Sequence, residues 1–304
     1  MRAIQMSEYG APEVLRLVEA PTPEPGPGQV RVRTAAVGVN PADFKWRAGW
    51  FKERLPLTFP HIPGYDGAGV VDALGAGAQD LAVGDRVVFM MPPVAQGAYA
   101  EYVVMPTATA APIPSNLDFA TAAALPTPGL TGVQLIEDHI APAPRDIVLI
   151  TGAVGGVGRF SVRAAKLLGA RVVAAVRARQ VEEARALGAD EVIVLGEEDW
   201  SGPLFDHVAD TVGGPEVAKL CLRMKPGGRL CTVSTTPIDP AGLPAEPLFI
   251  AVRQDRAKLS QLAQWAASGE LPVPVARRMP LAQAPEAQRL MEAGGQNGKI
   301  VLEL

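Results

Sequence analysis

The chain has 304 residues, of which 48% are hydrophobic and 20% are charged, and its formal net charge is −4. This composition excludes the disordered and collagen-like classes, and the length, between one domain and three, predicts two packed domains that share one cleft. A slightly acidic chain without a dense Lys/Arg cluster is also not expected to bind nucleic acid nonspecifically.

The number of cysteines and the hydropathy pattern indicate in which cellular compartment the protein is expected. Cys221 and Cys231 are the only two cysteines, so the chain has neither a disulfide framework nor a four-sulfur zinc lobe, and a reducing setting is favoured. The first residues lack the apolar stretch of a secretory signal, and no apolar run elsewhere approaches the length of a membrane span. We therefore expect a soluble, cytoplasmic protein.

The first third of the chain contains short apolar, β-branched runs separated by Gly, Pro and Asp. Such runs predict strands, and their close spacing favours a compact antiparallel, barrel-like unit. The predicted strands are residues 30–39, 69–74, 85–91 and 99–105, and the Pro-rich residues 21–27 are predicted to be a surface connection.

From about Phe119 the pattern changes to alternating helical and strand-like segments. This alternation is typical of βαβ units that build a doubly wound parallel sheet, so a second domain is predicted to start there. Its predicted strands are residues 147–151, 171–176, 191–195, 207–211 and 228–234, with a helix at 160–168. Helices at 255–268 and 285–293 and a last strand at 299–304 follow.

A glycine-rich octet, Thr151-Gly152-Ala153-Val154-Gly155-Gly156-Val157-Gly158, lies directly after one predicted strand and directly before a predicted helix. Glycines permit a tight turn and a close approach to a pyrophosphate, and the helix N-terminus offers unpaired N–H groups to the same anion. The match is A-x-G-x-x-G, and it predicts that residues 153–158 bind a dinucleotide. The alternative is a glycine-rich turn without a ligand.

Dinucleotide choice is expected at the end of the next strand, where an Asp or Glu would hold the ribose hydroxyls of NAD. Arg177 and Arg179 follow Val176 instead. Their guanidinium groups suit the 2′-phosphate of NADPH, which is therefore the predicted cofactor. In the competing interpretation, both arginines are ordinary solvated residues at a helix start.

The octet also fits T-G-x-x-x-G-x-G, the cofactor loop of short-chain dehydrogenases. Those enzymes need a Tyr with a Lys four residues later, and none of the four tyrosines of this chain has one. Their nucleotide loop also opens the chain, whereas about 150 residues precede it here. This family is therefore rejected.

Several blocks in order resemble the medium-chain dehydrogenase and reductase superfamily, and the resemblance covers nearly the whole chain. The blocks are residues 38–43, 61–71, 83–87, 151–158, 210–214, 225–229 and 298–302. The resemblance implies a GroES-like, β-barrel-type catalytic domain of residues 1–118 and 254–304. Residues 119–253 would form a Rossmann dinucleotide-binding domain.

Alcohol dehydrogenases of this superfamily place a zinc-binding Cys where this chain has residues 40–43, and a zinc-binding His where it has Tyr65. Catalytic zinc needs three protein ligands of Cys, His or carboxylate type, and His61, His139, His207 and the two cysteines show no compact spacing. We predict no metal, and we expect His139 and His207 to be structural.

Without a Lewis acid, hydrogen bonds have to stabilise the negative charge that develops on a substrate oxygen. A conjugated acceptor spreads that charge, as an enolate or a hydroquinone anion, and needs only a few aimed donors. Residues 40–49 are similar to the corresponding segment of the zinc-free quinone and enone reductases of the superfamily. The resemblance implies hydride transfer from NADPH to a quinone or an α,β-unsaturated carbonyl.

By matching position, the resemblance implies catalytic roles for Asn40, Lys45 and Tyr65. Asn40 would orient the nicotinamide or donate to the substrate oxygen, and Lys45 or Tyr65 would donate to the enolate. In the alternative interpretation Tyr65 is a packing residue, Lys45 is a solvated helix residue, and Asp43 is an N-terminal cap beside Pro41; for Asp43 we favour the structural role.

Further cofactor contacts also follow from the resemblance, because ligands gather at strand ends of open parallel sheets. They are Thr127, Thr131, Val212, Gly213, Ser234 and Lys299. Relatives are often dimers joined through the nucleotide domain, so a homodimer is expected. Two rival functions stay open, a zinc-dependent alcohol dehydrogenase with unfamiliar ligands and a non-catalytic NADPH-binding protein of the lens-crystallin kind.

Overall fold

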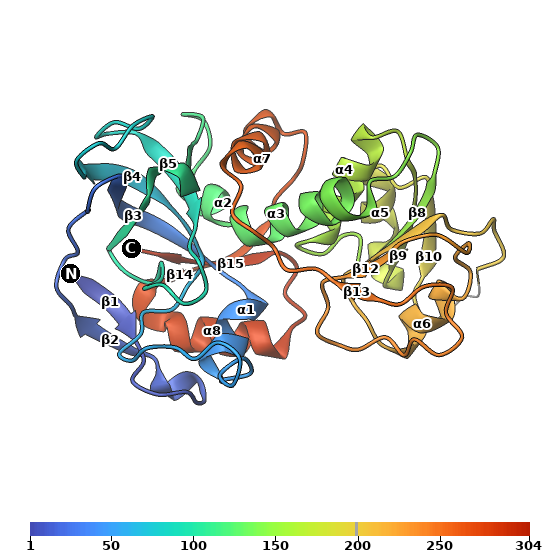
Figure 1. Cartoon of the computed structure of the whole chain (residues 1–304), viewed down its shortest axis with the longest axis horizontal. Helices are drawn as coiled ribbons and strands as arrows, with labels where there is room; N and C mark the ends of the chain where they lie inside the picture. The colour runs from blue at the N-terminus through green and yellow to red at the C-terminus, as the bar shows by residue number, and fades with distance from the viewer. Residues whose placement is uncertain (198–199) are drawn as a thin grey trace. The chain divides into compact units, whose positions relative to one another are not determined.

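The computed structural model describes residues 1–197 and 200–304, which form two compact units (Figure 1). The first unit combines Met1–Thr127 with Gln254–Leu304, and the second is Pro128–Arg253. Both ends of the chain therefore lie in the first unit. Each unit has its own core of buried apolar side chains.

The first unit is built mainly on an antiparallel sheet with strand order β14-β15-β3-β4-β5-β7, to which β6 adds by pairing with β3; only β14 and β15 run parallel. A separate pair, β1 and β2, completes its strands. The strands are β1 (Arg2–Gln5), β2 (Arg16–Glu19), β3 (Gln29–Val39), β4 (Asp66–Leu74), β5 (Arg86–Met90), β6 (Tyr102–Pro106), β7 (Ala110–Pro112), β14 (Val275–Pro280) and β15 (Lys299–Glu303).

Alternation along β3 explains how this sheet forms its core. Val30 and Val32 are fully buried, whereas the intervening Arg31 is half-buried and Arg33 is exposed, as expected for a strand with one face on the core. The β3–β4 register shifts next to Gly69, where a Cβ atom would lie only 2.1 Å from the Arg33 carbonyl oxygen. Glycine is therefore required at this position, because the two strands leave no room for a side chain.

Four α-helices accompany this sheet, and side-chain caps explain where two of them begin. Asp118 accepts hydrogen bonds from the N–H groups of Ala120 and Thr121, and Asp255 accepts one from Lys258. The helices are α1 (Pro41–Arg47), α2 (Phe119–Ala123), α7 (Arg256–Ser268) and α8 (Ala284–Ala293), with short 3-10 turns η1 (Pro12–Val14), η2 (Thr107–Thr109) and η5 (Leu281–Gln283).

The second unit is a six-stranded sheet in which every pairing is parallel, with strand order β10-β9-β8-β11-β12-β13. Its strands are β8 (Ile147–Thr151), β9 (Arg171–Val176), β10 (Glu191–Val194), β11 (His207–Asp210), β12 (Leu230–Thr232) and β13 (Leu248–Phe249). The chain order reverses at β8, which lies between β9 and β11. In a doubly wound fold that switch point is where ligands bind.

The helices between these strands complete the βαβ units. They are α4 (Gly158–Leu167), α5 (Val181–Ala186) with the preceding turn η4 (Ala178–Gln180), and α6 (Pro215–Cys221). Helix α3 (Pro126–Gln134) and the π-helix η3 (Leu135–Ile140) lead into β8. The predicted α/β class, a GroES-like unit plus a doubly wound parallel sheet, is confirmed.

Two details differ from the sequence prediction. Helix α2 packs against β3 and β4, so residues 119–127, which the sequence pattern assigns to the nucleotide domain, lie with the first unit. The strand predicted at residues 99–105 begins only at Tyr102, because Tyr99 accepts a backbone hydrogen bond from Ile4 and Ala100 pairs with Ala3.

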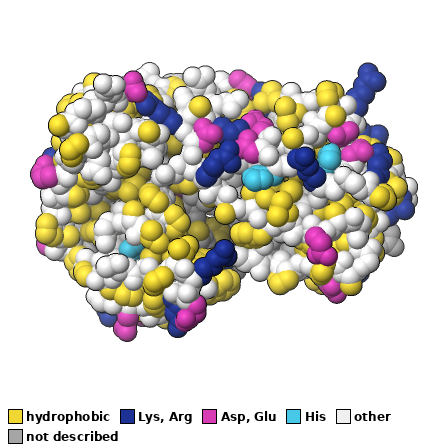
Figure 2. All heavy atoms as spheres, in the orientation of Figure 1, with side chains coloured by type: hydrophobic (Ala, Val, Ile, Leu, Met, Phe, Trp, Pro, Cys, Tyr) yellow, Lys and Arg dark blue, Asp and Glu magenta, His cyan; other side chains and the backbone are white. Residues whose placement is uncertain are grey.

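Charged side chains of both signs are interspersed on the face drawn in Figure 2, and hydrophobic side chains cover much of the part formed by the first unit. Among residues 1–197 and 200–304, no helix has both the length and the apolar character needed to cross a membrane.

Candidate functional site

The glycine octet forms the turn between β8 and α4, and two of its glycines are required by packing. At Gly152 φ is +61°, and a Cβ atom there would lie 2.5 Å from the Thr211 hydroxyl oxygen. At Gly158 a Cβ atom would lie 2.2 Å from the Gly152 carbonyl oxygen. These close approaches fold the start of α4 back onto the end of β8, as the sequence motif requires.

The other two glycines leave the outer surface of the turn open. Gly155 and Gly156 are exposed, and a Cβ atom at Gly156 would find its nearest neighbour, Pro128 Cβ, at 3.6 Å. An exposed backbone without side chains, next to the first N–H groups of a helix, is the chemistry that a pyrophosphate needs. The turn therefore fits a dinucleotide, and it brings the predicted residues 153–158 together.

Asp210, a residue that the sequence reasoning missed, organises the strand ends beside this turn. Its carboxylate is fully buried and accepts hydrogen bonds from the Thr151 hydroxyl at 2.6 Å and from the Thr232 hydroxyl at 2.5 Å. These contacts tie together the carboxyl ends of β8, β11 and β12. The block Asp-Thr-Val-Gly-Gly at residues 210–214 was a signal, because an acid at the end of a buried strand needs donors.

The same carboxylate positions two predicted cofactor contacts directly, and a third is bonded to one of them. The N–H groups of Val212 and Gly213 donate to Asp210 Oδ1 at 3.0 and 2.9 Å. The Ser234 hydroxyl donates to the Val212 carbonyl at 2.8 Å, so Val212, Gly213 and Ser234 lie together at the carboxyl ends of β11 and β12. Thr131, on α3 in the same unit, is buried at 7% exposure.

Arg177 and Arg179 lie directly after β9 and are exposed. Arg177 precedes η4, where its N–H donates to Gln180 Oε1 at 3.3 Å. Within the described parts of the chain neither guanidinium forms an ion pair. Their donors therefore remain available at the end of the second strand of the parallel sheet, where the sequence predicts the ribose to be recognised.

A buried polar cluster in the first unit contains three other predicted residues. The Asn40 side-chain amide donates to Asp66 Oδ2 at 2.9 Å, and its oxygen accepts from the Lys299 ammonium at 2.6 Å. Lys299 also donates to the Val39 carbonyl, and Thr127 donates to Asp66 through its N–H at 3.0 Å and its hydroxyl at 2.6 Å. Asn40 is thus held from both sides.

The charges in this cluster compensate each other. Asp66 is fully buried, and burial raises its pKa, while burial lowers the pKa of Lys299. Each charge opposes the pKa shift that burial causes in the other group, because a nearby ammonium stabilises the carboxylate and a nearby carboxylate stabilises the ammonium. Asp66 was also missed by the sequence reasoning, although it follows Tyr65 in a glycine-rich motif.

Asp43 lies on the first turn of α1 and is fully buried. It helps to cap the N-terminus of the helix, as expected, through a capping box. Asn40 is the N-cap residue, and Asp43, at the third helical position, accepts the Asn40 N–H at 2.7 Å through Oδ2. The same oxygen accepts the Tyr99 hydroxyl at 3.1 Å. Burial, reinforced by nearby Asp66, raises the pKa of Asp43 to about 7.

The Tyr65 and Lys45 side chains occupy different surroundings. The Tyr65 hydroxyl is buried and lacks a hydrogen-bond partner among the described residues, and burial raises the pKa of Tyr65, so it stays a protonated donor. The Lys45 ammonium lies over the rings of Phe44 and Trp50, at 5.9 and 5.6 Å from their centroids. Burial lowers the pKa of Lys45.

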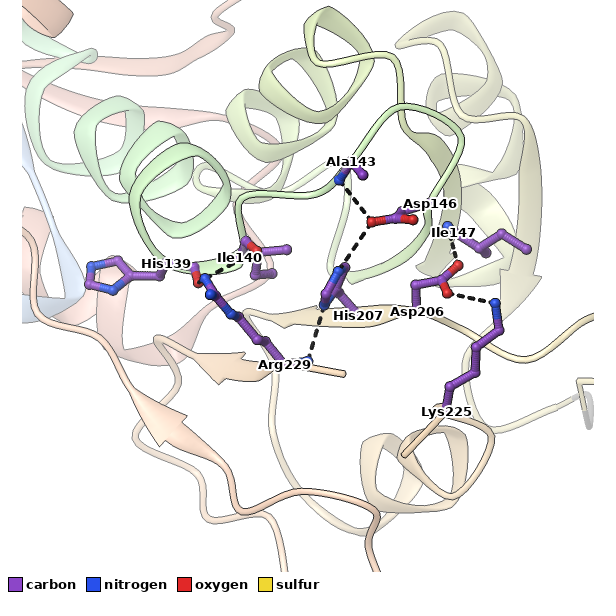
Figure 3. A network of polar contacts seen from close by, with 9 residues as sticks. All are labelled: His139, Ile140, Ala143, Asp146, Ile147, Asp206, His207, Lys225 and Arg229. Carbon is purple, nitrogen blue, oxygen red and sulfur yellow. Dashed lines mark hydrogen bonds and ion pairs between the residues drawn. The ribbon is translucent and has the colours of Figure 1, made fainter. Parts of the chain in front are cut away.

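The histidines of the second unit take part in a structural network (Figure 3). His207 Nε2 lies 3.3 Å from Asp146 Oδ2, and its Nδ1 accepts the Arg229 N–H at 3.1 Å. Arg229 in turn donates to the His139 carbonyl. This network joins the starts of β8 and β11, the end of the sheet opposite the glycine turn. No group of three potential metal ligands occurs among the described residues.

Comparisons with known proteins agree with this arrangement. An alcohol dehydrogenase GroES-like domain matches residues 26–115, and a domain described as zinc-binding dehydrogenase matches residues 187–302. A chloroplastic quinone-oxidoreductase of Triphysaria versicolor is 31% identical, over 100% of this chain and 98% of its own length. A chloroplastic NADPH-dependent alkenal/one oxidoreductase of Arabidopsis thaliana is 32% identical, over 99% of this chain and 79% of its own.

Solved structures give the same result. An NAD-dependent alcohol dehydrogenase has a TM-score of 0.89 at 33% identity, with 100% of both chains covered. The quinone oxidoreductase of Coxiella burnetii has a TM-score of 0.86 at 30% identity, with 100% of this chain and 99% of that chain covered. A mycobacterial protein complexed with NADPH has a TM-score of 0.83 at 29% identity, with both chains fully covered. The chain therefore belongs to the quinone oxidoreductase-like branch of the medium-chain dehydrogenase/reductase superfamily, a family of oxidoreductases.

Proposed function

We propose that this protein is an NADPH-dependent oxidoreductase that transfers hydride, without zinc, to a quinone or an α,β-unsaturated carbonyl. The observation that carries the proposal is the buried donor set of the first unit. Asn40 is fixed between Asp66 and Lys299, and the Tyr65 hydroxyl has no protein partner among the described residues. Asn40 already donates to Asp66 and, at 3.5 Å, to the Gly38 carbonyl, so among the described residues the Tyr65 hydroxyl is the unpartnered donor of this set. One such donor suits an oxygen whose developing charge is spread by conjugation.

The cofactor would be held by the second unit. Gly155 and Gly156 would seat the pyrophosphate, Ser234 and Thr131 would contact the nicotinamide half, and Arg177 and Arg179 would bind the 2′-phosphate. When bound, NADPH supplies the hydride. The names of the Arabidopsis relative and of the mycobacterial complex support NADPH, whereas the alcohol dehydrogenase structure is described as NAD-dependent.

In this proposal the first unit stabilises the charge on the acceptor and returns a proton. Asn40 orients the nicotinamide or donates to the oxygen, and Tyr65, kept protonated by burial, is the proton donor that we favour. Lys45 remains the alternative donor. Lys299 would act mainly by holding Asn40, because its ammonium already donates to Asn40 and Val39. Thr127 would fix Asp66 from the other side.

The proposal that the reaction needs no zinc depends on the residues at the expected ligand positions. Where alcohol dehydrogenases of the superfamily are expected to place Cys and His, this chain has residues 40–43 and Tyr65. The amide of Asn40 and the phenol of Tyr65 are poor ligands for zinc, and the carboxylate of Asp43 already accepts from Asn40 and Tyr99 through Oδ2. The competing function is an alcohol dehydrogenase with atypical ligands. It is favoured by the match to a zinc-binding dehydrogenase domain and by the alcohol dehydrogenase structures.

We also propose a homodimer formed through the second unit. Strand β13 is the last strand of the parallel sheet, and its two residues, Leu248 and Phe249, are 57% and 56% exposed. An apolar edge strand invites pairing with another chain, and a second copy would satisfy it. The buried, unbridged Cys221 and Cys231 support a reducing location such as the cytoplasm.

The decisive experiment measures NADPH oxidation with a benzoquinone, methyl vinyl ketone, acrolein and cyclohexanone, each with and without a chelator. We expect turnover of the conjugated acceptors, unaffected by the chelator. Turnover of cyclohexanone alone, or a loss of activity with the chelator that zinc restores, would favour an alcohol dehydrogenase. Tight NADPH binding without turnover of any acceptor would favour a non-catalytic binding protein.

A further inference from the structure

A small pocket lies within the first unit, and Tyr65 is one of the residues that line it. Trp46 and Leu57 form apolar walls, and Asp43, Arg47, His61 and Tyr65 contribute its polar lining. Pro93, which is exposed, also lines the pocket. The pocket therefore joins Tyr65, the proposed proton donor, to a buried carboxyl group that the proposed reaction does not yet use.

Each polar residue of the pocket has a buried atom without a hydrogen-bond partner among the described residues. These atoms are Asp43 Oδ1, Tyr65 Oη, His61 Nδ1, and Nε and Nη1 of Arg47. A buried polar atom left unpaired destabilises the folded protein, so these atoms call for a partner. An ordered water makes two to four hydrogen bonds, and the pocket offers about 10 Å³ to the centre of a water molecule, which suits about one water.

The hydrogen bonds around Asp43 determine which of its oxygens can carry a proton. Oδ2 accepts both the Asn40 N–H and the Tyr99 hydroxyl, so a proton on Asp43 resides on Oδ1. Arg47 only donates, and its other Nη pairs with Glu292 on α8. Burial lowers the pKa of His61 to about 4, so its ring is neutral near pH 7 and accepts through one nitrogen.

We propose that an ordered water in this pocket connects Asp43 Oδ1 to the Tyr65 hydroxyl, and that Asp43 supplies the proton that Tyr65 delivers to the reduced acceptor. This inference rests on the proposed function. After hydride transfer, the Tyr65 O–H bond breaks as its proton bonds to the enolate or hydroquinone anion. The phenolate takes a proton from the water, and the water takes one from Oδ1. Solvent then reprotonates Asp43, so one proton is consumed per turnover.

The charges around Asp43 determine the pH range of this relay. Asp66 on β4 raises the pKa of Asp43, while Lys299 on β15 and the Tyr99 hydroxyl lower it; Arg47, Glu292, His61 and Tyr65 are the other titratable groups nearby. Since the folded-state pKa lies near neutral, Asp43 holds its proton at acidic pH and loses it as the pH rises through that value. The relay therefore predicts a kcat that falls on the alkaline side.

The first test compares wild type, Asp43→Asn and Tyr99→Phe with benzoquinone between about pH 5 and about pH 9. Asparagine keeps an oxygen that accepts the hydrogen bonds from Asn40 and Tyr99, but it has no proton to release. The kcat of Asp43→Asn should therefore be at least about tenfold below wild type at acidic pH, and it should no longer fall as the pH rises. Tyr99→Phe removes a hydrogen bond that lowers the Asp43 pKa, so the fall in kcat with rising pH should occur at a higher pH in this variant. The KM for NADPH should stay unchanged in both.

The second test needs no turnover. In protein labelled with ¹³C in the aspartate carboxyl groups, one resonance should titrate near neutral pH, disappear in Asp43→Asn and move to higher pH in Tyr99→Phe. The relay is wrong if no resonance behaves in this way, or if Asp43→Asn keeps the wild-type kcat and its fall with rising pH. If no acceptor is turned over but the resonance titrates as expected, the proton site stands and the proposed function fails.

Discussion

Alanine substitutions at Gly156 and Gly158 separate the packing role of the glycine turn from its binding role. At Gly158 the new methyl would lie 2.2 Å from the Gly152 carbonyl oxygen and 2.7 Å from Ala153 Cα, and both of these are backbone atoms. The turn has to shift to relieve these contacts, at a cost of about 1–3 kcal/mol. At Gly156 the nearest atom is 3.6 Å away, which is an ordinary contact.

The two variants should therefore have opposite effects on the stability of the folded protein. Gly158→Ala should lower the unfolding temperature and also weaken NADPH binding. Gly156→Ala should fold at least as well as wild type, because alanine at a compatible position stabilises by about 0.4–1 kcal/mol through the unfolded chain. It should nevertheless weaken NADPH binding, because its methyl would project from the exposed backbone that is proposed to seat the pyrophosphate.

Thermal unfolding and titration calorimetry with NADPH measure the two effects independently, and each variant is the matched control of the other. If Gly156→Ala bound NADPH with the wild-type Kd, the pyrophosphate would not lie against this part of the turn. A wild-type unfolding temperature for Gly158→Ala would refute the close approach between the start of α4 and the end of β8.

Three further predictions follow from the site and from the sheet edge. Replacing Arg177 and Arg179 with Ala should weaken NADPH binding about 10- to 100-fold, because one or two charge-assisted hydrogen bonds to the 2′-phosphate are lost, and should affect NADH binding little. If calorimetry found equal losses for both dinucleotides, the arginines would not bind the 2′-phosphate. Tyr65→Phe should change the unfolding temperature little, since the hydroxyl bonds no protein group among the described residues, and it should lower kcat by about 100-fold. An unchanged kcat would exclude Tyr65 as the proton donor. Phe249→Glu should convert a dimer to monomers in sedimentation analysis, with Val83→Glu, an equally exposed residue of the first unit, as the control.

The sequence alone was sufficient for the architecture because the fold depends on local, periodic signals. The strands β8 and β9 occupy the residues that hydrophobic runs predict, and α7 occupies nearly the predicted range because Asp255 caps it and Gly269 ends it in a left-handed conformation. The glycine turn was predictable for the same reason, since its motif, strand and helix are contiguous in the chain.

Partnerships between distant residues were decided only by the tertiary structure. Nothing in the local pattern links Asn40 to Lys299, and Asp210 became visible as a hub only when β8, β11 and β12 were placed side by side. The capping role of Asp43 was predictable because its partner Asn40 is close in sequence. Its burial against Tyr99 and its place in the pocket with Tyr65 depend on residues far along the chain. Sequence periodicity specifies which face of an element is buried, whereas the pairing and pKa of a buried polar group depend on which other elements enclose it.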